Sequence, residues 1–236
     1  RHWQVRISND SNAVGPRIYH IHHGTRQMPY INYPFTHLEE LKAFLAELAR
    51  PLELDTPEGR QSRPGLEVQL YYTVRELSNH CSELWAFRSF GDEIFTTREG
   101  LTYTDMGAFN FAPGGGYPWL QEHLVDHYVP AWRTDWLDAA GLPGDFCAAI
   151  TTRSDSRLIN YYVESLHYLF RETGAQGLYL DGIGFGREVT KRVARTLAKL
   201  RPDYRINMHC SDLYPSSKIS VMNHAMEHLP YLTDLW

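Results

Sequence analysis

The most constraining feature of the sequence is a regular alternation of helix-like and strand-like patterns in its second half. An apolar stripe at helical spacing covers about 155–173 and ends at Gly174, and the continuous apolar run 176–182 follows it. A second helical stripe over about 187–200 precedes the strand-like run 204–210. Strands that alternate with helices at this spacing predict a parallel sheet, because each helix carries the chain back to the start of the next strand.

The same alternation is expected earlier in the chain and at its end. The remaining strand-like runs are 16–24, 66–74, 146–152 and the final segment "YLTDLW", and a further helix is predicted over about 37–49. Glycine and proline interrupt the regular patterns in two segments, 51–65 and 112–118, which we interpret as loops.

Polar residues stand at the ends of nearly all the expected strands. They are His22, His23, Arg75, Glu76, Thr151, Thr152, Asp181, His209 and Asp212. This distribution favours an α/β protein of the (β/α)8 TIM-barrel type, whose active site collects side chains from many strand ends. A doubly wound dinucleotide fold lacks its glycine-rich fingerprint here. We count five or six βα units, so the barrel looks truncated at both ends of the chain, with 1–15 as the end of a preceding segment or linker and 16–236 as a partial catalytic barrel.

Composition excludes several classes of protein. The net charge of −5 disfavours a general binder of nucleic acid, which would normally be basic. No apolar run approaches the roughly 20 residues of a membrane span. The three cysteines, Cys81, Cys147 and Cys210, have no zinc-ribbon spacing, and no cofactor motif is present. No cofactor, no nucleic acid and no membrane is therefore expected as a partner, and the oligomeric state stays open.

Asp181 is the sharpest single candidate for catalysis. It ends the apolar run "GLYLD" and precedes a glycine, so a barrel would hold it at the carboxyl end of a strand, where pKa values are tuned. The alternative is that Asp181 caps the next helix or pairs with Arg187.

Asp92 and Glu93 form the only adjacent Asp-Glu pair in the chain, in the segment "SFGDEIF". Two neighbouring carboxylates after a glycine turn are suited to act as a polarising group and a general acid. The alternative is a solvated surface turn, and the dipeptide by itself decides nothing.

The segment "HIHH" places His20 and His22 on one face of the first strand, because strand side chains alternate. Two histidines at a strand end are able to hold a divalent metal, with His209 and Asp181 completing the set. We favour histidines that line a polar cleft or contact a sugar, and we name His22, His23 and His209 as substrate-binding candidates.

Aromatic and polar residues are interleaved in "GGGYPWLQEHLVDHYVPAW", residues 114–132. Tryptophan and tyrosine present flat apolar faces with a polar edge, and such faces suit sugar rings. The substrate-binding candidates from this pattern are Trp119, Glu122, His123 and Trp132, with plain core packing as the alternative for the tryptophans. Glu227 precedes the last expected strand and is either a second carboxylate of the cleft or a surface charge.

Several longer segments together resemble the barrel of large bacterial proteins related to glycoside hydrolase family 123. They are "YYTVRELSNH", "RSFGDEIF", "WLQEHLVDHYVPAW", "NYYVESLHYLF" and "GLYLDGIGFGREVTKRVARTL", and the resemblance spans roughly 16–236. Family 123 implies a retaining β-N-acetylgalactosaminidase whose catalytic feature is an adjacent Asp-Glu pair at a barrel strand end. Only Asp92 and Glu93 match that description.

The resemblance implies that Glu93 protonates the glycosidic oxygen while Asp92 orients the acetamido group that attacks the anomeric carbon. With a sugar that has no acetamido group, Asp181 is the candidate nucleophile. The resemblance also favours a secreted or periplasmic location. Two other functions stay open: a metal-dependent hydrolase of the amidohydrolase type that uses His20 and His22, and a barrel that binds glycan without cleaving it.

Overall fold

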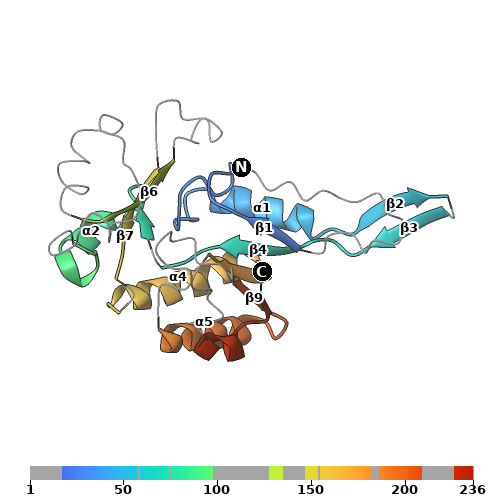
Figure 1. Ribbon diagram of the computed structural model, residues 1–236. Helices are drawn as coiled ribbons and strands as arrows, with labels where there is room; N and C mark the ends of the chain where they lie inside the picture. Colours follow the sequence, from blue (N-terminus) through green and yellow to red (C-terminus); the bar gives the residue numbers. More distant parts are fainter. Residues whose placement is uncertain are drawn as a thin grey trace, which may run out of the picture.

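A parallel five-stranded sheet forms the centre of the molecule (Figure 1). The computed structural model describes residues 18–57, 59–74, 76–97, 128–134, 147–153, 155–181, 186–208 and 226–235. The strands, in their order across the sheet, are β1 (Ile18–Ile21), β4 (Glu67–Tyr71), β8 (Gly177–Leu180), β9 (Arg205–Met208) and β10 (Asp234–Leu235). Every neighbouring pair among them is parallel. The strands therefore follow one another in space in the same order as along the chain.

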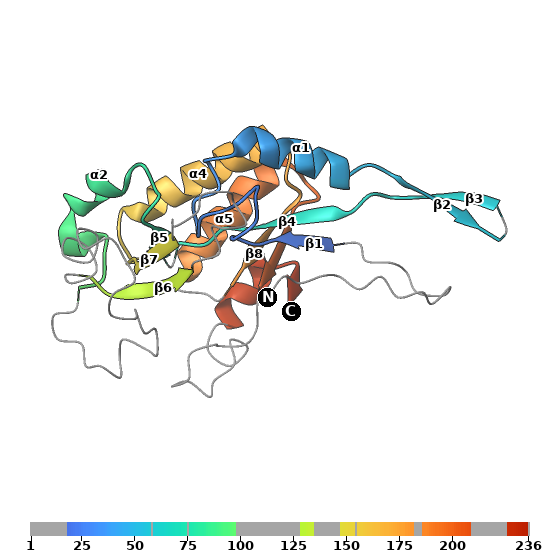
Figure 2. The same cartoon turned by 90° about the horizontal axis from the view of Figure 1, so that it is seen from above.

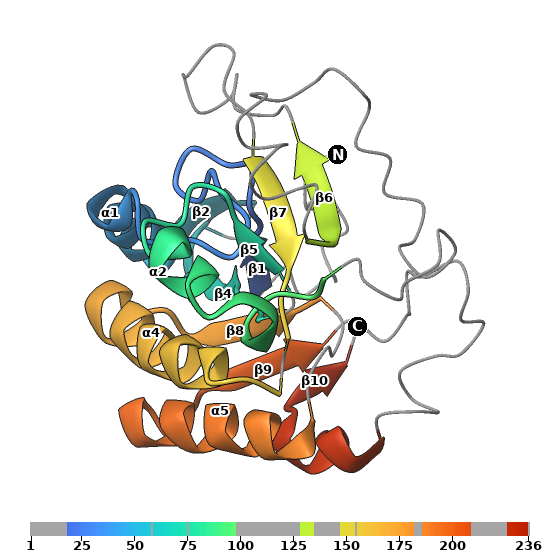
Figure 3. The same cartoon turned by 90° about the vertical axis from the view of Figure 1, so that its left-hand side faces the viewer.

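Three α-helices cover one face of this sheet, as expected (Figure 3). They are α1 (Leu38–Leu48), α4 (Leu158–Thr173) and α5 (Arg187–Leu200), each lying between two successive strands of the sheet in sequence. The 3-10 helix η4 (Met226–Tyr231) packs beside α5 and leads into β10. Sequential strand order with helices on one face is the arrangement of a (β/α) barrel, in which a single sheet curls around its own interior.

Helix α4 forms at its predicted place because of local features of the sequence. The buried stripe of α4 includes Tyr162, Leu166 and Leu169, and the Tyr162 hydroxyl donates a hydrogen bond of 2.9 Å to the Tyr72 carbonyl oxygen just after β4. Gly174 ends α4 in the left-handed conformation, φ 69°, which glycine adopts without steric cost. These features fix the helix against the sheet at its expected boundaries.

The segment 146–152 corrects one expectation, because its strand does not belong to the parallel sheet. After β4 the chain forms β5 (Glu76–Ser78), α2 (Leu84–Arg88), η1 (Gly91–Glu93), β6 (Pro130–Thr134) and β7 (Cys147–Thr151) before α4 begins. Strand β7 pairs antiparallel with both β5 and β6. We call these elements the excursion. An apolar run does not reveal its partner strands, and here the partners lie within the same excursion.

The segment 51–65 corrects a second expectation, because most of it is regular. Strands β2 (Leu52–Thr56) and β3 (Gly59–Arg63) form an antiparallel hairpin, with Gly59 at φ 117° after the turn. All residues of β3 are exposed, so the hairpin lacks the buried apolar face by which strands are recognised in sequence. It extends from the amino end of β4, at the other end of the molecule from the excursion (Figures 1 and 2).

The main hydrophobic core lies between the sheet and its helices. Outward-facing strand residues such as Leu70, Leu178 and Ile206 are fully buried there, together with Leu166 and Leu197 from α4 and α5. No helix in the described part of the chain is long and apolar enough to cross a membrane.

Candidate functional site

The inner face of the sheet, opposite the helices, carries most of the polar strand residues. Side chains alternate along each strand, so residues two apart share a face. The inner-face residues of the first four strands are His20 and His22, Gln69 and Tyr71, Gly177, Tyr179 and Asp181, and Arg205 and Asn207. Barrel interiors are usually filled by branched apolar residues, whereas this one is lined with imidazole, phenol, amide and carboxylate groups.

Asp181 follows β8 directly and stands at the carboxyl end of the sheet, where it was expected. Burial lowers the pKa of His22, and the Asp181 carboxylate acts in the opposite direction, which shows that the two groups are close enough to interact. Burial raises the pKa of Tyr179, and Asp181 raises it further. Asp181 is half-buried, so its carboxylate stays reachable beside a neutral imidazole and a neutral phenol.

An aromatic group surrounds His22 at this end of the sheet. The ring centroid of His22 lies 4.2 Å from that of Tyr71 and 4.2 Å from that of His23, while His23 and Tyr71 are 5.1 Å apart. The ring of Tyr179 closes the group at 6.0 Å from Tyr71. Burial lowers the pKa of His23 well below its usual value, and His22 lowers it further, so His23 is neutral at neutral pH.

A buried carboxylate, Glu76, holds Tyr71 in place. Glu76 is 2% exposed, and its Oε1 accepts hydrogen bonds from the Tyr71 hydroxyl at 3.2 Å and from Asn32 Nδ2 at 3.3 Å. Asn32 also donates to the Glu76 carbonyl oxygen at 2.9 Å and accepts from the Thr73 backbone N–H at 2.8 Å. The loop after β1 and the strand after β4 are thereby locked together around Tyr71.

His20 lies on the same face as His22 but two positions earlier, further from the carboxyl end of the strands. Its ring stacks on Tyr179, with centroids 4.5 Å apart and planes 12° from parallel, and its Nε2 is 2.9 Å from Gln69 Oε1. Burial lowers the pKa of His20. Among the described residues no group of three or more His, Cys, Asp and Glu side chains is arranged to hold a metal ion, although His209 falls outside them.

Asp92 and Glu93 lie in the excursion, within the 3-10 turn η1, and not directly after a strand of the parallel sheet. Asp92 is exposed, and its carbonyl oxygen accepts a hydrogen bond of 3.2 Å from Arg153. Glu93 forms an ion pair with Arg157, whose guanidinium lies over the Phe90 ring at 4.8 Å. The pair is therefore engaged with the segment that leads into α4.

The other sequence candidates divide into two groups. Trp119, Glu122, His123 and His209 lie outside the described residues, and Trp132 is in β6, where only the backbone is described. Glu227 lies in η4 beside α5, with its carboxylate 3.6 Å from His228 Nε2, and His228 in turn contacts Thr190 of α5 at 2.6 Å. Glu227 is thus held in the helical layer, away from the inner face that carries Asp181.

Sequence reasoning missed Tyr71 and Tyr179 as site residues and noted Glu76 only as a polar strand end. The alternation of polar and apolar residues in "EVQLYY" was a usable signal, because it places Glu67, Gln69 and Tyr71 on one face. No local pattern marks Asn32, which has a positive φ of 49° and contacts residues more than forty positions away.

The chain belongs to a known protein family. The model of the glycoside hydrolase 123 TIM-barrel domain matches residues 1–236. No curated protein matches the chain in sequence.

The solved structures that resemble the chain include the following three. The α-amylase from Geobacillus thermoleovorans, complexed with acarbose, has 11% identity, a TM-score of 0.44 and coverage of 82% of this chain and 36% of its own. The Anoxybacillus α-amylase has 14% identity, a TM-score of 0.41 and coverage of 72% and 29%. Eubacterium rectale Amy13B has 8% identity, a TM-score of 0.41 and coverage of 72% and 31%. The chain thus spans about a third of the length of each of these enzymes.

Proposed function

Because the chain belongs to the glycoside hydrolase 123 TIM-barrel domain family, we propose that it supplies the catalytic barrel of a glycoside hydrolase. The single observation that carries this proposal is the position of Asp181, a reachable carboxylate at the carboxyl end of β8, beside His22 and Tyr179. Active sites of characterised TIM-barrel enzymes lie at this end of the strands.

Asp181 acts at the anomeric carbon in this proposal. With a substrate that has no acetamido group, a carboxylate oxygen of Asp181 bonds to the anomeric carbon as the bond to the leaving oxygen breaks. Water then attacks the same carbon and releases the carboxylate. With an N-acetylhexosaminide, the acetamido oxygen makes that attack in place of Asp181, and the family resemblance gives the orientation of the acetamido group to Asp92.

His22 is the member of the aromatic group that is suited to contact a sugar, because it is half-buried, whereas Tyr71, Tyr179 and His23 are buried around it and support it. Burial lowers the pKa of His22, so its imidazole is neutral. A neutral imidazole both donates and accepts hydrogen bonds, which suits the hydroxyl groups of a sugar. This chemistry supports a carbohydrate partner.

Glu93 is the proton donor that the family resemblance implies, with Asp92 as the group that orients an acetamide. For Glu93 to act in this way, its ion pair with Arg157 must open when the substrate binds, because a general acid must carry a proton. This assignment is separable from that of Asp181 and is tested on its own below.

Nitrophenyl glycosides of neutral hexoses and of N-acetylhexosamines, applied to the full chain, test the proposal. We expect turnover of at least one of them and a loss of about 10²–10⁴-fold in kcat for Asp181→Asn. Asp203→Asn is the matched control, because it removes one carboxylate charge from an exposed pair with Arg201 before β9, at the opposite end of the strands from Asp181.

Comparison of the two sugars identifies the attacking group. Loss of activity toward neutral hexosides alone assigns Asp181 as the nucleophile, whereas loss toward N-acetylhexosaminides would move acetamide orientation from Asp92 to Asp181. Full activity of Asp181→Asn toward every substrate that the unaltered chain cleaves would overturn the proposal.

A further inference from the structure

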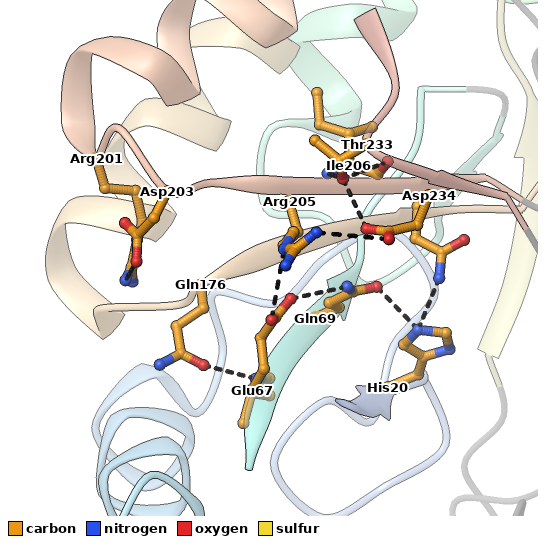
Figure 4. Close-up of polar contacts among 12 residues, drawn as sticks. His20, Glu67, Gln69, Gln176, Arg201, Asp203, Arg205, Ile206, Thr233 and Asp234 are labelled. Atoms are coloured by element: carbon orange, nitrogen blue, oxygen red, sulfur yellow. Dashed lines mark hydrogen bonds and ion pairs between the residues drawn. The ribbon is translucent and has the colours of Figure 1, made fainter. Parts of the chain in front are cut away.

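A continuous series of polar contacts crosses the inner face of the sheet below the candidate site (Figure 4). It consists of Asp234, Arg205, Glu67, Gln69 and His20, and we call it the inner ladder. Arg205 is 3.6 Å from Asp234 and 3.6 Å from Glu67, Glu67 accepts a hydrogen bond of 3.1 Å from Gln69 Nε2, and Gln69 Oε1 is 2.9 Å from His20 Nε2. The ladder connects charged groups at the amino end of the strands to an imidazole at the base of the site.

Gly177 makes this connection possible. In the sheet register it lies between Gln69 on β4 and Arg205 on β9. A Cβ atom at this position would lie 2.7 Å from Gln69 Cγ and 3.0 Å from Arg205 Cβ, closer than carbon atoms approach without displacement. The missing side chain therefore leaves the space in which Arg205 reaches across β8 to Glu67.

The ladder has a fixed direction of donors and acceptors. A carboxylate only accepts hydrogen bonds, so Glu67 obliges Gln69 to present its NH₂ group toward it. The carbonyl oxygen of the Gln69 amide then faces His20 and also only accepts. The proton of a neutral His20 must consequently sit on Nε2.

Asn207 offers a second acceptor for this proton once its side-chain amide is turned. Its amide is 3.4 Å from the same His20 nitrogen, and its Oδ1 is a buried atom without a hydrogen-bond partner among the described residues. Rotation of the amide by half a turn exchanges Nδ2 and Oδ1 and offers that oxygen to the Nε2–H of His20. One proton on Nε2 thus satisfies acceptors on two strands.

The fixed orientation of His20 affects the candidate site through its contact with Tyr179. The two rings are stacked nearly parallel, and Tyr179 lies two residues before Asp181 on the same face of β8. A ring that is held by a hydrogen bond at one edge has fewer available orientations, so Tyr179 gains a rigid support.

We propose that Glu67 and Gln69 are positioning residues, which fix His20 with its proton on Nε2 and thereby hold Tyr179 beside Asp181. The effect on tautomer and ring position depends on the chain alone, whereas the effect on catalysis rests on the function proposed above. Burial lowers the pKa of His20, which is consistent with a neutral ring in a single tautomer.

The test replaces Glu67 with glutamine in the full chain and reads the His20 tautomer from nitrogen NMR shifts of histidine-labelled protein, with His20→Gln identifying the resonance. A glutamine at 67 is able to accept or donate, so Gln69 is free to turn and offer its NH₂ group to His20. We expect the ratio of the two tautomers to change by about tenfold. Glu53→Gln is the same substitution in the exposed hairpin, where Glu53 pairs with Arg60, and it should leave the ratio unchanged.

Kinetics of the same variants complete the test. We expect Glu67→Gln to lower kcat by roughly tenfold with little change in KM, because a displaced Tyr179 misplaces Asp181 more than it weakens binding. Gln69→Leu, which keeps the side-chain volume and removes the acceptor, should change the tautomer in the same direction. An unchanged tautomer in both variants, or a changed tautomer with unchanged kcat, overturns the proposal. Because the NMR shift is read without substrate, it remains informative if Asp181→Asn shows that the proposed function is wrong.

Discussion

The two places that offer carboxylates for catalysis, the carboxyl end of β8 and the turn η1, have opposite surroundings. Asp181 lies among aromatic rings and neutral imidazoles at the end of a buried parallel strand. Glu93 lies in an exposed turn of the excursion, where it already forms an ion pair with the Arg157 guanidinium. The contrast teaches that the partners of a carboxylate, more than its place in a sequence motif, indicate whether it is available for chemistry.

The largest expected effect separates these two carboxylates by their response to the leaving group. We expect Asp181→Asn to lower kcat/KM about 10²–10⁴-fold for both good and poor leaving groups, since it acts on bond formation at the anomeric carbon. Glu93→Gln should reduce the rate only with a poor leaving group, which needs a proton to depart. The effects of Asp181→Asn and Glu93→Gln are measured as kcat and KM for a nitrophenyl glycoside, which has a good leaving group, and for the corresponding disaccharide, which has a poor one. Unchanged rates for Glu93→Gln on both substrates would show that Glu93 is not the general acid and serves only in the ion pair with Arg157.

A smaller effect separates the contributions of the two regions to stability. Leu178 of β8 is fully buried, so Leu178→Ala should lower the free energy of unfolding by about 2–5 kcal/mol. The side chains of Arg157 and Glu93 are 60% and 38% exposed, so Arg157→Gln should cost less than about 1 kcal/mol. Urea unfolding followed by tyrosine and tryptophan fluorescence gives both values. A larger loss for Arg157→Gln than for Leu178→Ala would contradict this ranking.

The smallest expected effect is a pH dependence of stability that arises from the histidines near Asp181. Burial lowers the pKa of His20, His22 and His23 below their usual value of 6.5, so near that pH the unfolded chain binds more protons than the folded chain. Stability from these groups is complete above pH 6.5 and decreases as the pH falls below it. We expect the melting temperature to fall accordingly, and His23→Gln to reduce the slope. A slope that His23→Gln leaves unchanged would assign the pH dependence to other groups.

The sequence predicts the elements of the sheet better than it predicts the excursion. Helices α4 and α5 and strand β8 were located correctly, because apolar periodicity and Gly174 are local signals. The antiparallel pairing of β7 was not predictable, because it depends on which strand meets it in space. The family resemblance and the barrel are confirmed by the family match over 1–236.

The candidate site shows the same limit at the level of single residues. Asp181 was found because an apolar run ended in a charge, a signal contained within seven residues. The support of Tyr71 by Glu76 and Asn32 joins positions 32 and 76, and that of His20 by Gln69 joins positions 20 and 69. Such contacts are set by strand order and register, which a single sequence does not contain.

The β2–β3 hairpin has a practical consequence for work with this barrel. It extends from the amino end of β4 (Figure 2), and all residues of β3 are exposed, whereas Asp181 follows the carboxyl end of the neighbouring strand β8. A fluorophore or a solid support attached through Ser62 would therefore sit at the far end of the strands from Asp181. Protein immobilised in this way presents the carboxyl ends of the strands to the solution.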